Sequence, residues 1–363
     1  MQMKNLSEGV LSDRQIRQML DAGSILSEKP IENGQIQPAS LDLRLGAKAF
    51  RVRASFLSGK SAKVSERLAA FTMHEMDLTA GAVLEKGCVY VVPLLEALCL
   101  PDFIYGAASA KSSIGRLDLL TRIITDHGEE FDRIPAGYTG QLYVEICPRS
   151  FSVVVGIGQM LNQIIFRVGK TVYTDAELKK LHEENQIVSG KPIISDGLGF
   201  SVDLKPIKGD LVGYRAKPHT GVIDLKKLNF YEPSDYWEEI RTTNSQIVLD
   251  PGAFYILVSR ESIVIPPNCA AEMVPYLAMV GEFRVHYAGF FDPGFGHSVA
   301  GLGSRGVLEV RCHEAPFILE HGQVVGKLLY ERMSEVPKQL YGKEIASNYQ
   351  GQRLKLSKHF KNS

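Results

Sequence analysis

The chain contains two related copies of one sequence. LEKGCVYVVPLLEALCLP at Leu84–Pro101 aligns with LDPGAFYILVSRESIVIP at Leu249–Pro266 at a constant offset of 165 residues. Further along, Glu145 pairs with Glu309 at an offset of 164. Matches at a nearly fixed offset over most of the chain predict a duplicated fold.

The length fits such a duplication. The chain has 363 residues, about twice the roughly 150 residues of a common domain. A polar stretch follows the first copy, and polar stretches often connect domains. We therefore expect a first domain over residues 1–170, a linker over 171–195, and a second, diverged domain over 196–363.

Each copy consists mainly of short runs of β-branched and aromatic residues between glycines and prolines. GQLYVEI and AFYILVS are examples. This pattern predicts a mainly β fold, with two tandem barrels or sandwiches and a few short helices. One helix is expected from an N-cap at Ser12 to a stop at Gly23, and another over Asp175–Gln186.

Composition excludes several classes of protein. Lys plus Arg and Asp plus Glu both number 41, whereas a nucleic-acid binder usually has an excess of basic residues. The apolar runs are far shorter than the ~20 residues of a membrane span, and the N-terminus lacks the pattern of a secretory signal. We expect a cytoplasmic protein that binds neither nucleic acid nor membrane. The five cysteines are scattered without a CxxC pair, which favours reduced thiols over disulfides or a zinc site.

The first candidate site is the segment KSSIGR, Lys111–Arg116. Its hydroxyls, cations and backbone N–H groups suit a phosphate chain. An ordinary helix start with solvated Lys and Arg side chains explains the same residues. The second copy has VPYLAMVGEF at the corresponding place, without these serines and cations. The two copies therefore differ in their chemistry.

The second candidate is Glu145, in the expected strand GQLYVEI. A carboxylate among apolar strand residues is costly to bury unless it is paired or catalytic. Glu145 is therefore either a general base or a structural glutamate held by Arg116 or Arg133.

Other polar groups are weaker candidates. Asp292 in AGFFDPGFG is a turn residue or a catalyst, and the first copy has Pro135 at that place. The acidic run TDHGEEFD at 125–132 lacks metal-ligand spacing, so a solvated loop is expected. His313 and Glu314 do not match a zinc deaminase, because the spacing differs and no PCxxC follows. The C-terminal segment is a frayed tail or a flap that closes over a nucleotide.

Four motifs, in their order along the chain, resemble the dCTP deaminase branch of the dUTPase-like family. They are IQPASLDLRLG at Ile36–Gly46, KSSIGR, the GxxxxE strand that ends at Glu145, and NYQGQR at Asn348–Arg353. The resemblance implies β-rich trimers with active sites between subunits, and deamination without zinc.

The resemblance also assigns roles. Glu145 would be the general base that activates water, while Ser112 and Arg116 would position the water and stabilise the intermediate. Lys111 and Ser113 would bind the triphosphate as its Mg²⁺ complex. The remaining substrate-binding residues would be Arg133, Tyr138, Tyr341, Tyr349, Gln350 and Gln352.

Two positions depart from the family pattern. Asn348 replaces a phosphate-binding lysine, and Pro135 replaces the turn aspartate that the second copy keeps as Asp292. These departures suggest composite sites, with KSSIGR and Glu145 from the first copy and the tail from the second.

The expected activity is hydrolysis of dCTP to dUTP and ammonia, for dUMP and thymidylate synthesis, by a homo-oligomer that is preferably a trimer. One alternative is an enzyme that releases dUMP and pyrophosphate, or a plain dUTPase, with Asp292 and Glu309 as a possible second site. The other alternative is a regulatory module that only binds deoxynucleotides.

Overall fold

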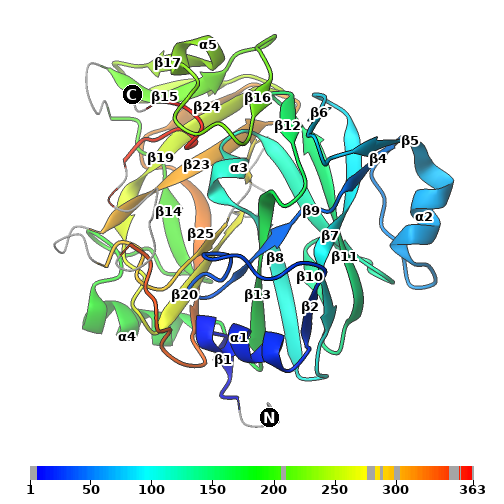
Figure 1. Cartoon of the computed structure of the whole chain (residues 1–363). Coiled ribbons are helices and arrows are strands. Elements are labelled where there is room, and N and C mark those ends of the chain that lie inside the picture. Colours follow the sequence, from blue (N-terminus) through cyan, green and yellow to red (C-terminus); the bar gives the residue numbers. More distant parts are fainter. Residues whose placement is uncertain are drawn as a thin grey trace. The chain divides into compact units, whose positions relative to one another are not determined.

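The computed structural model describes residues 6–205, 210–275, 283–286, 289–297, 303–342, 351 and 353–361. Strands dominate these residues, and the helices are short (Figure 1). The predicted mainly β fold is confirmed.

The chain divides into two units that are not simply its two halves. Unit 1 consists of Met1–Thr171, Gly221–Lys227 and Met333–Lys338. Unit 2 consists of Val172–Thr220, Leu228–Arg332 and Gln339–Ser363. Most of the stretch expected as a linker belongs to unit 2, because helix α4 (Asp175–Asn185) buries Leu178 and Leu181 in the hydrophobic core of that unit.

Unit 1 contains three sheets. The first has the order β1-β13-β8-β10, with β3 also paired to β13; the second has the order β5-β4-β7-β11-β9, with β2 also paired to β7; the third is β16-β12-β6. The strands of the first sheet are β1 (Gly9–Val10), β3 (Leu41–Arg44), β8 (Ile104–Ala110), β10 (Arg133–Ile134) and β13 (Met160–Val168). Those of the second are β2 (Ile25–Ser27), β4 (Lys48–Val52), β5 (Thr72–Asp77), β7 (Val89–Cys99), β9 (Leu119–Thr125) and β11 (Thr139–Pro148). Those of the third are β6 (Ala82–Leu84), β12 (Val153–Val155) and β16 (Ile223–Asp224).

Two parts of unit 1 come from the second half of the sequence. Strand β16 runs parallel to β12, with Ile223 opposite Val153. The segment 333–338 lies along β1, where the Ser334 N–H donates to the Val10 carbonyl at 2.8 Å. Both segments complete sheet edges that would otherwise expose backbone hydrogen-bonding groups.

Unit 2 repeats this plan. Its sheets have the orders β14-β25-β20-β22, β17-β15-β19-β23-β21 and β18-β24. The strands are β14 (Leu198–Ser201), β15 (Leu211–Ala216), β17 (Trp237–Arg241), β18 (Gln246–Leu249), β19 (Phe254–Ile263), β20 (Cys269–Pro275), β21 (Phe283–His286), β22 (Phe290–Phe291), β23 (Ser304–Cys312), β24 (Phe317–Glu320) and β25 (Val324–Arg332).

The pairing of strands reproduces the sequence repeat. β7 pairs with β11 in unit 1 as β19 pairs with β23 in unit 2, and β8 with β13 corresponds to β20 with β25. The edge pairs β8–β10 and β20–β22 also correspond. The offset found in the sequence therefore relates two copies of one topology.

Of the remaining helices, α1 (Asp13–Asp21) matches the first predicted helix. Ser12 caps it, since its hydroxyl accepts from the Gln15 N–H at 3.3 Å, and Ile16 and Met19 are buried. The other three are α2 (Val64–Phe71), α3 (Ser112–Gly115) and α5 (Pro233–Tyr236). Figure 1 shows α2 beside β4 and β5.

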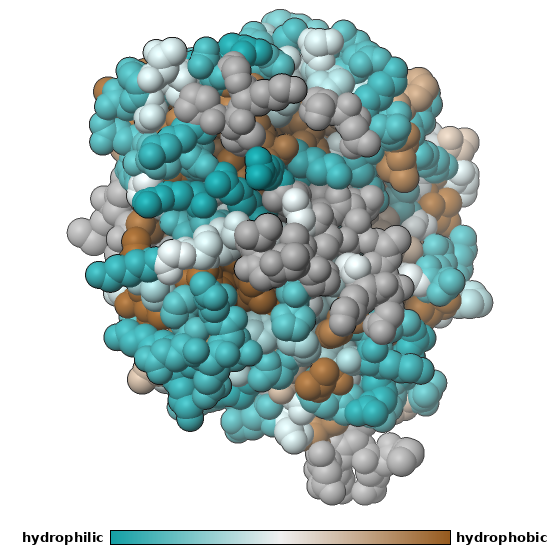
Figure 2. Space-filling view, turned by 90° about the vertical axis from the view of Figure 1, so that its left-hand side faces the viewer, coloured by the Kyte–Doolittle hydropathy of each residue, from teal (hydrophilic) through white to brown (hydrophobic). Residues whose placement is uncertain are grey.

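None of the helices in the described ranges has the length and apolar character needed to cross a bilayer. On the face in Figure 2, the coloured hydrophobic residues form small patches between polar ones.

Candidate active site

Strand β11 places Glu145 in the interior of unit 1. β11 lies between β7 and β9, and Glu145 is directly opposite Val91 on β7 and Arg122 on β9. Residues opposite one another in a sheet point to the same face. Val91 and Tyr143 on this face belong to a buried apolar cluster, and Glu145 is only 1% exposed.

A register shift interrupts the pairing of this strand with β7. Pro93 on β7 lies opposite Tyr143, and the pairing shifts between Gln141 and Tyr143. Proline has no N–H for the ladder, so such a shift beside it is expected. The two additional residues lie on β7, while β11 stays in unbroken register with β9.

Arg122 is the partner of Glu145. Its Nε and Nη2 both donate to Oε1 of Glu145, at 3.1 and 2.5 Å. The guanidinium lies over the ring of Phe131, 3.6 Å from the centroid, and Nη2 also donates to Ser55 Oγ at 3.0 Å. Oε2 of Glu145 is buried and has no hydrogen-bond partner among the described residues.

The sequence had suggested Arg116 or Arg133 as the structural partner; the arginine that binds Glu145 Oε1 is Arg122, and Arg133 pairs elsewhere. The side chain of Arg133 is exposed and its Nε lies 3.7 Å from Glu130 Oε2. Arg122 was missed because β9 and β11 are separated by a long loop and β10, so their register could not be read from the sequence. The alternation in LLTRIIT was the available signal.

The KSSIGR segment forms a single short helical turn. Lys111 caps α3 with extended backbone angles, and its carbonyl accepts from the N–H groups of Ile114 and Gly115 at 2.8 and 3.0 Å. Ser113 and Arg116 are buried, and Ser112 is half-buried. The turn is therefore fixed by the fold.

The ammonium of Lys111 contacts the carboxylate of Asp42 on β3. Asp42 belongs to the SLDL motif, so two motifs singled out in the sequence meet here. An ammonium has three N–H donors, and Asp42 takes one of them.

Glu145 and α3 lie near one another along a pair of strands. α3 leads into β9, whose first residue, Leu119, is opposite Pro148 on β11. Three residues further along this pair, Arg122 is opposite Glu145. At ~3.3 Å per residue, this places Glu145 roughly 10 Å along the strands from the start of β9, which follows the turn.

Tyr138 holds the backbone next to the site. Its hydroxyl accepts from the Asp126 N–H at 3.1 Å and donates to the Gln141 carbonyl at 2.7 Å. Burial raises the pKa of this phenol well above its usual range, and the hydrogen bond from Asp126 opposes the shift.

The second copy keeps the carboxylate but changes its surroundings. Glu309 on β23 lies opposite Ile256 on β19 and His286 on β21, the register that Glu145 has with Val91 and Arg122. Asp203, the counterpart of Asp42, binds Arg305 Nη1 at 2.5 Å and lies 3.3 Å from His321 Nδ1. In the second copy, Arg305 therefore takes the place of Lys111 as the cation that binds this aspartate.

The other predicted residues of the second copy are only partly described. Asp292 lies in a turn where its carbonyl accepts from Phe295 N–H at 3.1 Å. The Tyr341 N–H donates to the Pro293 carbonyl at 3.0 Å, and its ring packs against Phe295. The predicted Tyr349, Gln350 and Gln352 lie outside the described residues, as does Asn348.

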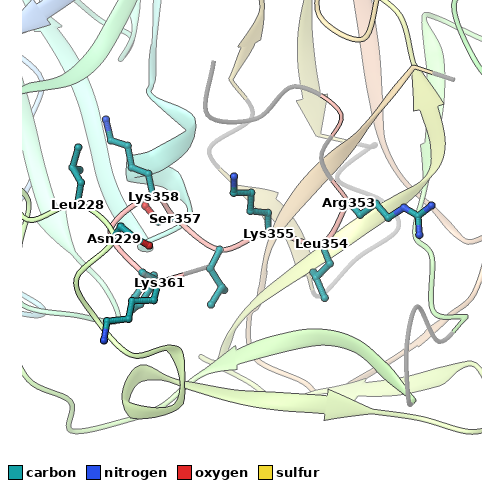
Figure 3. A pocket seen from close by; sticks show the side chains of 10 residues that line it. Leu228, Asn229, Arg353, Leu354, Lys355, Ser357, Lys358 and Lys361 are labelled. Atoms are coloured by element: carbon teal, nitrogen blue, oxygen red, sulfur yellow. The ribbon is translucent and has the colours of Figure 1, made fainter. Parts of the chain in front are cut away.

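The C-terminal segment of unit 2 lines a pocket of about 360 Å³ with four cationic side chains. Figure 3 shows that Lys358 and Lys361 point to opposite sides and that Arg353 turns away from both. Lys361 also contacts Glu232. The cationic groups therefore do not converge on one point.

Among the described residues, no three His, Cys, Asp or Glu side chains lie together in a way that could hold a metal ion. The KSSIGR segment combines the hydroxyls of α3 with the flanking cations Lys111 and Arg116, which suits a triphosphate rather than a protein-bound metal.

The duplicated β fold, with a buried glutamate on a central strand beside a Lys-Ser-Ser turn, defines a protein of the dUTPase-like superfamily. The N-terminal domain of the 2'-deoxycytidine 5'-triphosphate deaminase family matches residues 7–170, and its C-terminal domain matches residues 174–360. The chain belongs to this family, and the resemblance inferred from the motifs is confirmed.

Relatives agree with this assignment. A dCTP deaminase of Shewanella amazonensis is 36% identical over 143 residues, which are 37% of this chain and 70% of the relative. A "dCTP deaminase, dUMP-forming" of Corynebacterium glutamicum is 33% identical over 140 residues, 38% of this chain and 68% of the relative.

A solved structure of 2'-deoxycytidine 5'-triphosphate deaminase from Agrobacterium tumefaciens is similar over both copies. It is 53% identical with a TM-score of 0.88, and the match covers 90% of this chain and 99% of that one. The double length therefore also occurs in that protein.

Proposed function

We propose that this chain hydrolyses dCTP to dUTP and ammonia, with Glu145 as the general base. Membership of the family supports the reaction. The observation that carries the role of Glu145 is its Oε2 atom, which is buried and has no hydrogen-bond partner among the described residues. An acceptor in this state is costly to keep unless a donor binds it in the working enzyme.

The proposed chemistry uses the carboxyl group of Glu145 first in its deprotonated form, as a base, and then in its protonated form, as an acid. Oε2 takes a proton from water, and the resulting hydroxide adds to C4 of cytosine. The C4 carbon becomes tetrahedral, and the carboxyl group passes the proton taken from water to N3 of the ring. The carboxylate then takes the proton of the new C4 hydroxyl and gives it to the departing amino group, so ammonia leaves, the uracil carbonyl forms and the glutamate is regenerated. No zinc is needed in this scheme, because the carboxylate itself generates the nucleophile.

The residues of the KSSIGR segment complete the proposed site. Ser112 and Arg116 position the water and stabilise the tetrahedral intermediate. Lys111 and Ser113 bind the triphosphate, and Mg²⁺ arrives with the substrate and neutralises part of its charge. Arg133, Tyr138 and the tail contribute further substrate contacts. We also propose that the enzyme is cytoplasmic, works as a homo-oligomer, preferably a trimer, and supplies dUMP and thymidylate synthesis.

The variant Glu145→Gln tests the base. It removes proton transfer but keeps the size of the side chain, so we expect turnover to fall by about 100-fold or more while dCTP binding persists. Glu75→Gln is the control, since Glu75 is an exposed surface residue on β5 that pairs with Lys48. Full activity of Glu145→Gln would refute the assignment.

The relative named "dUMP-forming" favours a second candidate, in which the chain also hydrolyses the triphosphate to dUMP and pyrophosphate. Asp292 would then activate the second water. Incubation with dCTP, dCMP, CTP and dUTP, followed by chromatography and an ammonia assay, separates the two. dUTP as the final product supports the first candidate and dUMP with pyrophosphate the second, while tight binding without turnover would indicate a sensor.

A further inference from the structure

Arg122 binds one oxygen of Glu145 and leaves the other without a partner. In the common paired geometry, two N–H groups of arginine bind the two oxygens of a carboxylate. Here Nε and Nη2 both donate to Oε1, at 3.1 and 2.5 Å. The carboxylate is therefore held through Oε1, and Oε2 alone is left to accept a proton.

Arg122 is itself held from two sides. Phe131, from the loop between β9 and β10, supports the face of the guanidinium at 3.6 Å and packs against the buried apolar cluster. Ser55, from the segment between β4 and α2, accepts from Nη2 at 3.0 Å. An arginine side chain otherwise has ~2 kcal/mol of rotamer entropy. Two fixed contacts restrict that freedom, although the Arg122 side chain is 29% exposed.

We propose that Arg122 is a positioning residue that fixes Glu145 so that Oε2 faces the reacting water, and that Phe131 acts through Arg122. The inference rests on the proposed function of Glu145. A general base works only within hydrogen-bond reach of the proton it takes, and a displacement of ~1 Å can lower a rate by about 100-fold. A residue in this role affects the chemical step and leaves substrate binding nearly unchanged.

The test compares kcat and KM for dCTP in the full-length protein and four variants. Arg122→Met should lower kcat by about 10- to 100-fold with KM within about threefold. Arg122→Lys should recover part of kcat, because its ammonium can donate to Oε1 but cannot form two bonds and stack at once. Phe131→Leu should lower kcat by about threefold to tenfold. Arg53→Met is the matched control, since Arg53 lies over the Phe71 ring at 5.2 Å and is exposed; its kcat should not change.

The outcomes separate this inference from the proposed function. A wild-type kcat in Arg122→Met, or a rise in KM alone, overturns the positioning role. If Arg122→Met does not show a cooperative unfolding transition, Phe131→Leu and Arg122→Lys decide, and wild-type kcat in both overturns the role. Inactive Glu145→Gln with active Arg122→Met refutes only the positioning role. Active Glu145→Gln refutes the general base and the positioning role with it.

Discussion

Asp42 on β3 binds the ammonium of Lys111 at the start of α3, although 69 residues separate the two in sequence. The Asp42 side chain is 2% exposed and that of Lys111 23%. The contact joins the two motifs of unit 1 and fixes the start of the Lys-Ser-Ser turn.

Breaking this pair should destabilise the protein. Lys111→Met removes the cation that contacts the buried Asp42 carboxylate, so we expect the free energy of unfolding to fall by about 2–4 kcal/mol, near the range for a broken buried pair. Asp42→Asn combined with Lys111→Met should recover part of this loss, which urea denaturation of the double-mutant cycle would measure. Lys48→Met removes the exposed pair with Glu75 and should cost less than ~1 kcal/mol. Equal losses for the two lysines would contradict the prediction.

The two copies should respond differently to loss of equivalent glutamates. Glu96 is completely buried and accepts from Arg44 Nε at 2.7 Å and from the Arg44 N–H at 2.8 Å. Its counterpart Glu261 accepts from the N–H and hydroxyl of Ser201 and is half-buried. We expect Glu96→Gln to cost ~3–5 kcal/mol and Glu261→Gln ~1–2 kcal/mol. Chemical denaturation of both variants checks the order, and a larger loss for Glu261→Gln would disprove it.

Tyr330 should make the protein sensitive to alkali. Complete burial raises the pKa of this phenol well above its usual value, and its hydroxyl donates to the Val264 carbonyl at 3.0 Å. A raised pKa means that the stabilisation is fully present below pH ~10 and is lost as the pH rises, because the unfolded phenol ionises first. Tyr330→Phe should flatten the fall in stability above pH ~10 by up to ~1.4 kcal/mol per pH unit. Tyr105→Phe, which alters a surface hydroxyl, is the control. An unchanged slope in Tyr330→Phe would count against this explanation.

The cap of α1 should contribute more than an ordinary helix cap. Ser12 Oγ accepts from Gln15 N–H and also donates to Glu335 Oε1 at 2.5 Å. Ser12→Ala should therefore cost ~1–2 kcal/mol, measured by thermal unfolding. Thr174→Ala, at the exposed cap of α4, should cost no more than ~1 kcal/mol. If Ser12→Ala and Thr174→Ala lower the free energy of unfolding equally, the contact with Glu335 adds no stability.

The sequence predicted the elements better than their contacts. The offset between the copies predicted the duplicated topology, because a repeated pattern of strands and turns builds the same sheets twice. The apolar run around Glu145 predicted a strand there, and its burial comes from the apolar cluster that covers this face of the sheet. Ser12 and the pattern after Asp175 predicted both longer helices, because capping and helical periodicity are local signals.

Long-range partners could not be predicted in this way. Arg122 reaches Glu145 through the register of β9 against β11, two strands that a long loop and β10 separate in the sequence. The contact of Lys111 with Asp42 was not predicted, because it depends on the pairing of β13 with both β3 and β8, which brings the two motifs together. The proposed tail contacts of Tyr349, Gln350 and Gln352 stay predictions.

The interleaved composition of unit 1 has a consequence for biosynthesis. N-terminal domains commonly fold first, as the ribosome releases them. Unit 1, however, takes β16 and the segment 333–338 from far downstream, so it cannot close its sheet edges until nearly the whole polypeptide has been translated. A nascent chain that stops after residue 171 would keep those edges open, which favours aggregation. Shortening the gene to its first copy should therefore give an insoluble product, even though that copy carries the whole Lys-Ser-Ser turn and Glu145.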